Sequence, residues 1–257
     1  MRTCIPTIAY PSDETFIPPA PLVDPELQSS VTSLVGFVGV KRSGKDTAAR
    51  ALITQGWRRM AFADALKRMS LKLRGVWVEV PEEARLDSAI TAVGGFAQYH
   101  EVVDALGMEK AKDLVPDVRT LLQTLGTDCV RGTIGETTWT DLIEDRVRES
   151  LLRYDEPVVL TDVRFDEEFD LVRRLGGMNI GVWRGSLQSF NEAMERLWLD
   201  GDGFVTEGDD GSIIEHDADN HISEANTLRL LGWCDAVICN TGTVEGLHAA
   251  VLQAVGL

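Results

Sequence analysis

A short run of glycine and basic residues is the part of the chain best suited to hold phosphate. Residues 39–45 read GVKRSGK and fit the first seven positions of the GxxxxGK[ST] loop, between an apolar run and a stretch of helical character. Glycines let the backbone curl so that successive N–H groups face a phosphate, and the helix dipole adds positive potential there. Lys45 can then neutralise the β- and γ-phosphates while a bond to phosphorus breaks. The segment therefore predicts nucleotide binding or phosphoryl transfer.

The position after Lys45 departs from the motif. Asp46 stands where Ser or Thr usually holds Mg²⁺, and Thr47 follows it. An acid suits the positive end of a helix, but beside phosphate it is repulsive unless a cation lies between them. We therefore expect Mg²⁺ near Asp46 or Thr47, bound directly or through water. The sequence does not decide which residue is the inner-shell ligand.

A second charged group follows the apolar segment PVVLTD (157–162), which is typical of a buried strand. Asp162 and Arg164 lie at its carboxyl end, and ligands of open α/β sheets bind in the crevice beyond that edge. Asp162 can orient an acceptor or hold metal-bound water, and Arg164 can offset phosphate charge in the transition state. The alternative is a structural ion pair between the two side chains.

Strands and helices that alternate along the chain must position these groups. Short apolar runs predict buried strands, and segments of helical spacing lie between them. The pattern predicts an α/β P-loop NTPase fold, a parallel sheet flanked by helices, with inserted acceptor-binding and lid segments. We expect strands at 34–40, 59–63, 157–162, 178–183 and 235–240, and helices at 45–55, 64–74, 118–131, 138–153, 165–175 and 243–255.

The rest of the chain is assigned by composition. Residues 1–33 hold six of the nine prolines and predict an extended arm before a kinase domain at 34–257. Residues 75–116 have mixed character and predict an insertion on the acceptor side. Residues 186–220 predict a lid-like insertion, whose acidic, glycine-rich part, 200–220, is expected to be a loop or flap.

Charge and composition limit the classes of partner that the protein is expected to bind. The formal net charge is −16, which argues against a broad nucleic-acid footprint but not against a small anionic substrate held by a few focused arginines. No run approaches the roughly 20 apolar residues of a membrane span, so no membrane is expected as a partner. The first residues lack a secretory layout and the four cysteines form no CxxC, which together predict a cytoplasmic protein with reduced thiols.

Six segments resemble the deoxynucleoside monophosphate kinases of tailed bacteriophages, in matching order over roughly residues 34–255. The resemblance implies a nucleoside-monophosphate-kinase type of P-loop domain and the reaction ATP + dNMP → ADP + dNDP with Mg²⁺. It also implies the cytoplasm of an infected cell and is compatible with a homodimer. The segments are GVKRSGKDT (39–47), AFADALK (61–67), LLQTLGTD (121–128), LTDVRFDEE (160–168), HISE (221–224) and NTGTVEGL (240–247).

Carried over by position, the resemblance assigns site residues. Catalytic roles fall to Lys45, Arg42, Asp162 and Arg164. ATP is assigned to Arg42, Gly44, Lys45, Asp46 and Thr47. The monophosphate is assigned to Lys41, Lys67, Arg85, Arg119, Gly126, Thr127, Trp139, Asp162, Arg164 and Glu168, of which Arg85 lies in the poorly matched insertion.

Three of these residues have ordinary structural alternatives. Lys67 lies near the end of a predicted helix, where such kinases hold their acceptor, but it is also typical of a solvated surface lysine. Arg119 can clamp a phosphate with two hydrogen bonds or form a surface ion pair. Trp139 can stack on a base or pack as a core aromatic.

Two other functions remain open from the sequence. The same scaffold can phosphorylate a hydroxymethylated pyrimidine nucleotide, or such a base within DNA, although the acidic composition disfavours the polymer. A nucleotide switch or ATPase module would use the phosphate loop without an acceptor. No NKxD segment for guanine is found, and the basic residues beyond the loop exceed what one nucleotide needs. The sequence does not indicate which bases are accepted.

Overall fold

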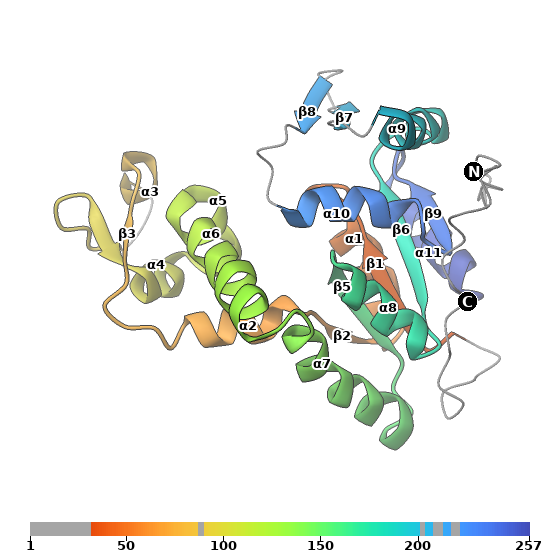
Figure 1. Cartoon of the computed structure of the whole chain (residues 1–257), viewed down its shortest axis with the longest axis horizontal. Helices are drawn as coiled ribbons and strands as arrows, with labels where there is room; N and C mark the ends of the chain where they lie inside the picture. The colour runs from red at the N-terminus through yellow and green to blue at the C-terminus, as the bar shows by residue number, and fades with distance from the viewer. Residues whose placement is uncertain (1–31, 87–89, 201–203, 208–212, 217–221) are drawn as a thin grey trace. The chain divides into compact units, whose positions relative to one another are not determined.

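The chain folds as two compact units in a computed structural model that describes residues 32–86, 90–200, 204–207, 213–216 and 222–257 (Figure 1). The first unit comprises the described residues up to Ala61 together with Glu144–Leu257, and the second comprises Phe62–Ile143. The second unit is therefore inserted into the first along the chain. Almost all of the predicted arm, residues 1–31, lies outside the described residues.

A five-stranded parallel sheet forms the centre of the first unit. Every neighbouring pair is parallel, as the alternation of strands and helices predicts. The α/β fold of a parallel sheet with a phosphate loop is thus confirmed. In spatial order the strands are β2 (Arg58–Met60), β5 (Val158–Val163), β1 (Leu34–Val38), β6 (Met178–Trp183) and β9 (Ala236–Cys239).

Helices cover both faces of this sheet. On one face, α1 (Lys45–Ile53) and α11 (Val244–Val255) pack alanine, leucine and valine side chains against strand residues such as Phe37 and Ile180. On the other face lies α8 (Asp166–Arg174), because a Cβ at Gly36 would meet Val172 of that helix at 2.8 Å. Every residue of β1 is buried, as expected for a central strand with two covered faces.

The remaining elements of the first unit follow β6. Helices α9 (Leu187–Asp200) and α10 (Ile222–Leu231) flank the antiparallel strands β7 (Phe204–Glu207) and β8 (Ile213–His216). The segment 200–220, expected to be a loop or flap, contains these two strands, which the sequence did not predict. The glycines and acids between them dominate the composition of the segment, while FVTE and IIEH are each rich in residues that favour strands.

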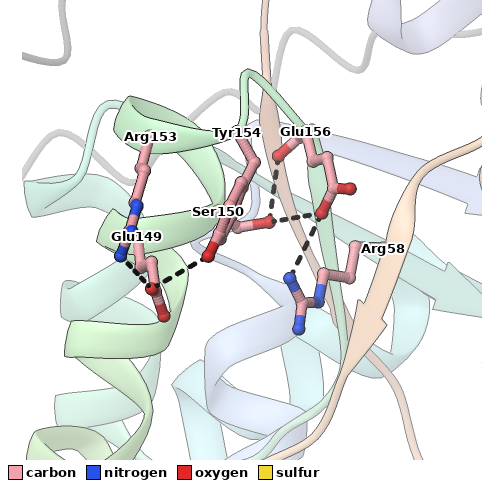
Figure 2. A network of polar contacts seen from close by, with 6 residues as sticks. All are labelled: Arg58, Glu149, Ser150, Arg153, Tyr154 and Glu156. Atoms are coloured by element: carbon pink, nitrogen blue, oxygen red, sulfur yellow. Dashed lines mark hydrogen bonds and ion pairs between the residues drawn. The ribbon is translucent and has the colours of Figure 1, made fainter.

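Figure 2 shows a polar network at the turn that leads into β5. Arg58 of β2 donates to the carboxylate of Glu156 at 3.2 Å, and the hydroxyl of Ser150 donates to the Glu156 carbonyl at 3.3 Å. The hydroxyl of Tyr154 donates to Glu149 at 3.3 Å, and the negative charge of Glu149 raises the pKa of Tyr154. These contacts join the amino ends of β2 and β5.

The second unit is mainly helical and has a core of its own. Tyr99 is fully buried at its centre, where its hydroxyl lies 2.8 Å from the hydroxyl of Ser70, and burial raises the pKa of Tyr99. The unit contains α2 (Ala63–Ser70), β3 (Trp77–Glu79), α3 (Glu82–Leu86), β4 (Phe96–Gln98), α4 (Tyr99–Leu106), α5 (Met108–Leu114), α6 (Pro116–Gln123) and the wide helix η2 (Thr124–Ile134).

Two predicted helices are each continued by wide π-type turns. The helix expected at 118–131 is α6 followed by η2, and the one expected at 138–153 is α7 (Thr138–Arg148) followed by η3 (Glu149–Arg153). Hydrophobic spacing indicates a helix but does not distinguish its hydrogen-bond pattern. Among the described residues, no helix has both the length and the apolar character needed to cross a membrane.

Candidate active site

The loop between β1 and α1 has the backbone geometry that a phosphate loop requires. A Cβ at Gly39 would lie 2.9 Å from the carbonyl oxygen of Val182, so only glycine fits where the loop leaves the sheet. Gly44, just before α1, has φ 97°, a left-handed conformation that glycine adopts at low cost. Arg42 also has positive φ, 65°. These dihedrals curl the chain in front of a helix amino terminus, where N–H groups and the helix dipole attract anions.

Lys45 is the first residue of α1 and is only 7% exposed. Its Nζ lies 3.4 Å from the carbonyl oxygen of Val40, which also accepts the N–H of Ser43 at 3.2 Å. The ammonium group is therefore held against the loop and not in bulk solvent. Lysine at this place in a phosphate loop neutralises charge on the β- and γ-phosphates.

The carboxyl end of β5 lies beside the phosphate loop. Strands β1 and β5 are parallel neighbours, and Val38 pairs with Val163. Gly39 and Arg164 therefore leave the sheet at the same edge. Asp162 lies within β5, two residues before Arg164. Both Asp162 and Arg164 are half-buried. The register therefore places the loop and the DxR segment at the same edge of the sheet.

Glu168 has a structural role that the sequence did not reveal. It is 3% exposed, and its Oε2 accepts the backbone N–H of Arg164 at 2.8 Å and that of Phe165 at 3.2 Å. Glu168 thus caps the amino terminus of α8 and fixes the turn that carries Arg164.

Arg184 lies at the loop and was missed by the sequence reasoning. It directly follows β6, and its Nη1 donates to the carbonyl oxygen of Arg42 at 3.4 Å. The side chain is exposed. The signal was present: a charged residue after a buried strand, at the carboxyl edge of a parallel sheet, is the same pattern that singled out Asp162.

Two of the three basic residues predicted to hold the monophosphate in the second unit, Lys67 and Arg119, are ion-paired there. Nζ of Lys67 lies 2.9 Å from Glu109, and Arg119 lies 3.5 Å from Asp113. Burial works to raise the pKa of Glu109, but hydrogen bonds and charges from Lys112 and Lys67 outweigh it and lower this pKa to about 2. The surface ion-pair alternative for Arg119 therefore has a partner in the structure.

Three further residues of the predicted acceptor set pack within the second unit. Trp139 is 6% exposed, and its indole N–H donates to the carbonyl oxygen of Gly126 at 3.0 Å. A Cβ at Gly126 would lie 2.7 Å from the end of the Leu66 side chain, so Leu66 packs closely against this glycine. Arg85 donates to the carbonyl oxygen of Val80 at 2.7 Å. These contacts agree with the core alternative for Trp139 and give Arg85 a structural partner.

The oxygen donors predicted to hold Mg²⁺ begin helix α1. Asp46 is exposed, and Thr47 is half-buried with its carbonyl oxygen 2.9 Å from Nε2 of His248. Carboxylate and hydroxyl oxygens are the hard ligands that Mg²⁺ prefers, and Mg²⁺ usually needs only one or two protein ligands besides water and phosphate. The donor chemistry at this position fits the ion.

Comparisons with known proteins agree with the geometry. Residues 88–194 match the family model for deoxynucleotide monophosphate kinase. A protein of Acanthamoeba polyphaga mimivirus described as "Putative deoxynucleotide monophosphate kinase" is 26% identical over 231 residues, which cover 86% of this chain and 95% of the relative. The resemblance to deoxynucleotide monophosphate kinases is confirmed.

The match to deoxynucleotide monophosphate kinases includes Arg119, Trp139 and the segment from Asp162 to Glu168, but begins after the phosphate loop. The assignment of the loop therefore rests on its own motif and geometry. The mimivirus relative is viral, although not from a bacteriophage. Among solved structures, the dephospho-CoA kinase from Campylobacter jejuni aligns with a TM-score of 0.41 and 11% identity, over 88% of this chain and 96% of that chain.

Proposed function

We propose that this protein transfers the γ-phosphate of ATP to a deoxynucleoside monophosphate, giving a deoxynucleoside diphosphate and ADP. The observation that carries the proposal is the pairing of Val38 with Val163. It brings a phosphate loop of kinase type to the same sheet edge as an acid and an arginine, Asp162 and Arg164. An acid and an arginine at this edge can orient an acceptor and offset charge on the transferring group.

In this proposal, the loop and its neighbours bind the donor. Backbone N–H groups of the loop and the dipole of α1 hold the β-phosphate, and Lys45 follows the γ-phosphate as charge develops on it. Arg42 and Arg184 add positive charge at the same place, which offsets the acidic surface of the chain locally. Asp46 and Thr47 would hold Mg²⁺, which supplies further neutralising charge to the phosphate oxygens.

The transfer itself needs positioning more than proton transfer. An oxygen of the acceptor phosphate attacks the γ-phosphorus, and the bond to the bridging oxygen breaks, so that ADP leaves with the electron pair. Arg164 stabilises the charge on the transferring group and on the acceptor phosphate, while Asp162 orients the acceptor. The other residues proposed to select or support the monophosphate are Lys41, Lys67, Arg85, Arg119, Gly126, Thr127, Trp139 and Glu168.

The proposed partners are small nucleotides. A net charge of −16 disfavours a nucleic-acid polymer, whose phosphates would be repelled by most of the surface. The cytoplasm, where ATP and deoxynucleotides are available, is the proposed location, and a homodimer is the proposed assembly.

A substrate panel tests the proposal. The purified protein is incubated with ATP and each deoxynucleoside or ribonucleoside monophosphate, hydroxymethylated pyrimidines included, and the products are resolved by chromatography. We expect a diphosphate product and ADP in equal amounts, with little ADP formed when the acceptor is omitted. ADP release that does not depend on any acceptor would indicate an ATPase and overturn the proposal.

A further inference from the structure

Asn240 ties three parts of the first unit together. It directly follows β9, and its backbone N–H donates to the carbonyl oxygen of Trp183 at the end of β6 at 2.7 Å. Its side-chain Nδ2 donates to the carbonyl oxygen of Ser43, inside the phosphate loop, at 3.0 Å. The carboxyl ends of β6 and β9 are therefore connected to the loop through this one residue, by its backbone on one side and its side chain on the other.

The contact fixes the direction of a loop peptide. A carbonyl oxygen can only accept, so the atom that faces Ser43 is the amide nitrogen of Asn240. The peptide between Ser43 and Gly44 is trans, and in a trans peptide the C=O and N–H point in opposite directions. Because Asn240 holds the carbonyl on its own side, the N–H of Gly44 points away from Asn240.

The fit around this peptide is tight. A Cβ at Gly44 would lie 2.3 Å from Nδ2 of Asn240, so the asparagine occupies the space beside the glycine. The left-handed φ of Gly44 belongs to the same arrangement. Ser43, whose carbonyl is held, is fully buried. Neither residue of the peptide can therefore turn without displacing the asparagine.

We propose that Asn240 is a positioning residue for the donor phosphates: it orients the N–H of Gly44 toward the phosphate chain of the nucleotide. This inference rests on the proposed function, because it takes the loop to be the site of the ATP phosphates. Backbone N–H donors cost no reorganisation when they are already aimed at the anion. Without Asn240 the peptide is free to rotate, and the loop loses one aligned donor.

The test is direct binding, measured by isothermal titration calorimetry with ATP and with tripolyphosphate alone, on the wild type, Asn240→Asp and Asn240→Ala. The aspartate keeps the shape of the side chain but cannot donate when ionised. Thr243→Ala is the matched control: Thr243 lies three residues beyond Asn240, and its hydroxyl caps α11 by accepting from the N–H of Gly246 at 3.2 Å. Circular dichroism confirms that each variant is folded.

We expect both Asn240 variants to raise the dissociation constants for ATP and tripolyphosphate by about tenfold or more, as for the loss of a hydrogen bond to a charged group. Thr243→Ala is expected to lower the melting temperature and leave both dissociation constants unchanged. Folded Asn240 variants that bind both ligands like the wild type would overturn the inference alone. A wild type that binds neither ligand would overturn the proposed function and the inference with it.

Discussion

Glu168 holds Arg164 by its backbone, because the buried carboxylate accepts the N–H of Arg164 at 2.8 Å. The same oxygen accepts the N–H of Phe165, so one side chain fixes both residues of the turn between β5 and α8. The backbone of Arg164 is therefore held in place at the sheet edge. An arginine that must meet a transferring phosphoryl group within a fraction of an ångström depends on such support.

Removal of the Glu168 carboxylate is expected to lower both the stability of the fold and the affinity for the acceptor. Glu168→Ala leaves two N–H groups without their acceptor at a helix start, which we expect to lower the free energy of unfolding by about 1–2 kcal/mol. KM for the monophosphate should rise, because Arg164 is no longer held. Glu168→Gln retains an acceptor oxygen, so it should lower the free energy of unfolding less and raise KM for the monophosphate less than Glu168→Ala does. Urea unfolding and steady-state kinetics measure the two effects, and an alanine variant as stable as the wild type would contradict this role.

Lys45→Ala is expected to abolish transfer. The ammonium group is held at the loop, and in the proposed reaction it follows the γ-phosphate into the transition state, so its loss should lower kcat by about 10²-fold or more. Arg50→Ala, an exposed arginine on the same helix, is the matched control and should leave kcat unchanged. A folded Lys45→Ala variant with near wild-type kcat would show that the loop does not bind the donor.

Arg164→Ala separates an acceptor site from a structural ion pair. If Arg164 contacts the acceptor phosphate, the variant raises KM for the monophosphate and lowers kcat, while KM for ATP changes little. Arg164→Lys should restore only part of the activity, because a point charge cannot reproduce a planar contact with two hydrogen bonds. If the residue only braces Asp162, the melting temperature should fall and both KM values should change together.

The lysine pair around Glu109 predicts a pH dependence of stability. The pKa of Glu109 is lowered to about 2 in the folded protein, so its ion pairs stabilise the fold above its ordinary pKa and lose that effect as the pH falls toward 2. The difference in stability between wild type and Glu109→Gln should therefore be present at pH 7 and vanish near pH 2. Lys112→Met should raise the pKa of Glu109, measured by carboxyl NMR. Glu101→Gln, at an exposed position on α4, is the control.

The sequence predicted the central sheet and the loop well, for physical reasons. Buried parallel strands are short apolar runs, and the glycines of the loop have no substitute at Gly39 and Gly44. Arg184 and Asn240 were not predicted as site residues, because their place at the loop depends on which strands are neighbours. The cap formed by Glu168 and the interior position of Trp139 depend on packing that spacing alone does not reveal.

The insertion of the second unit between β2 and β5 has a consequence for how the chain folds. Strand β1 is central, yet both of its neighbours, β5 and β6, come after the whole second unit in sequence. Contacts between segments so far apart are slow to form, because a long loop must close first. On the ribosome, the second unit, with its own core around Tyr99, is synthesised completely before β1 has any parallel partner. We therefore expect the inserted unit to become ordered first and the nucleotide-binding sheet to assemble last, when the carboxyl-terminal half emerges.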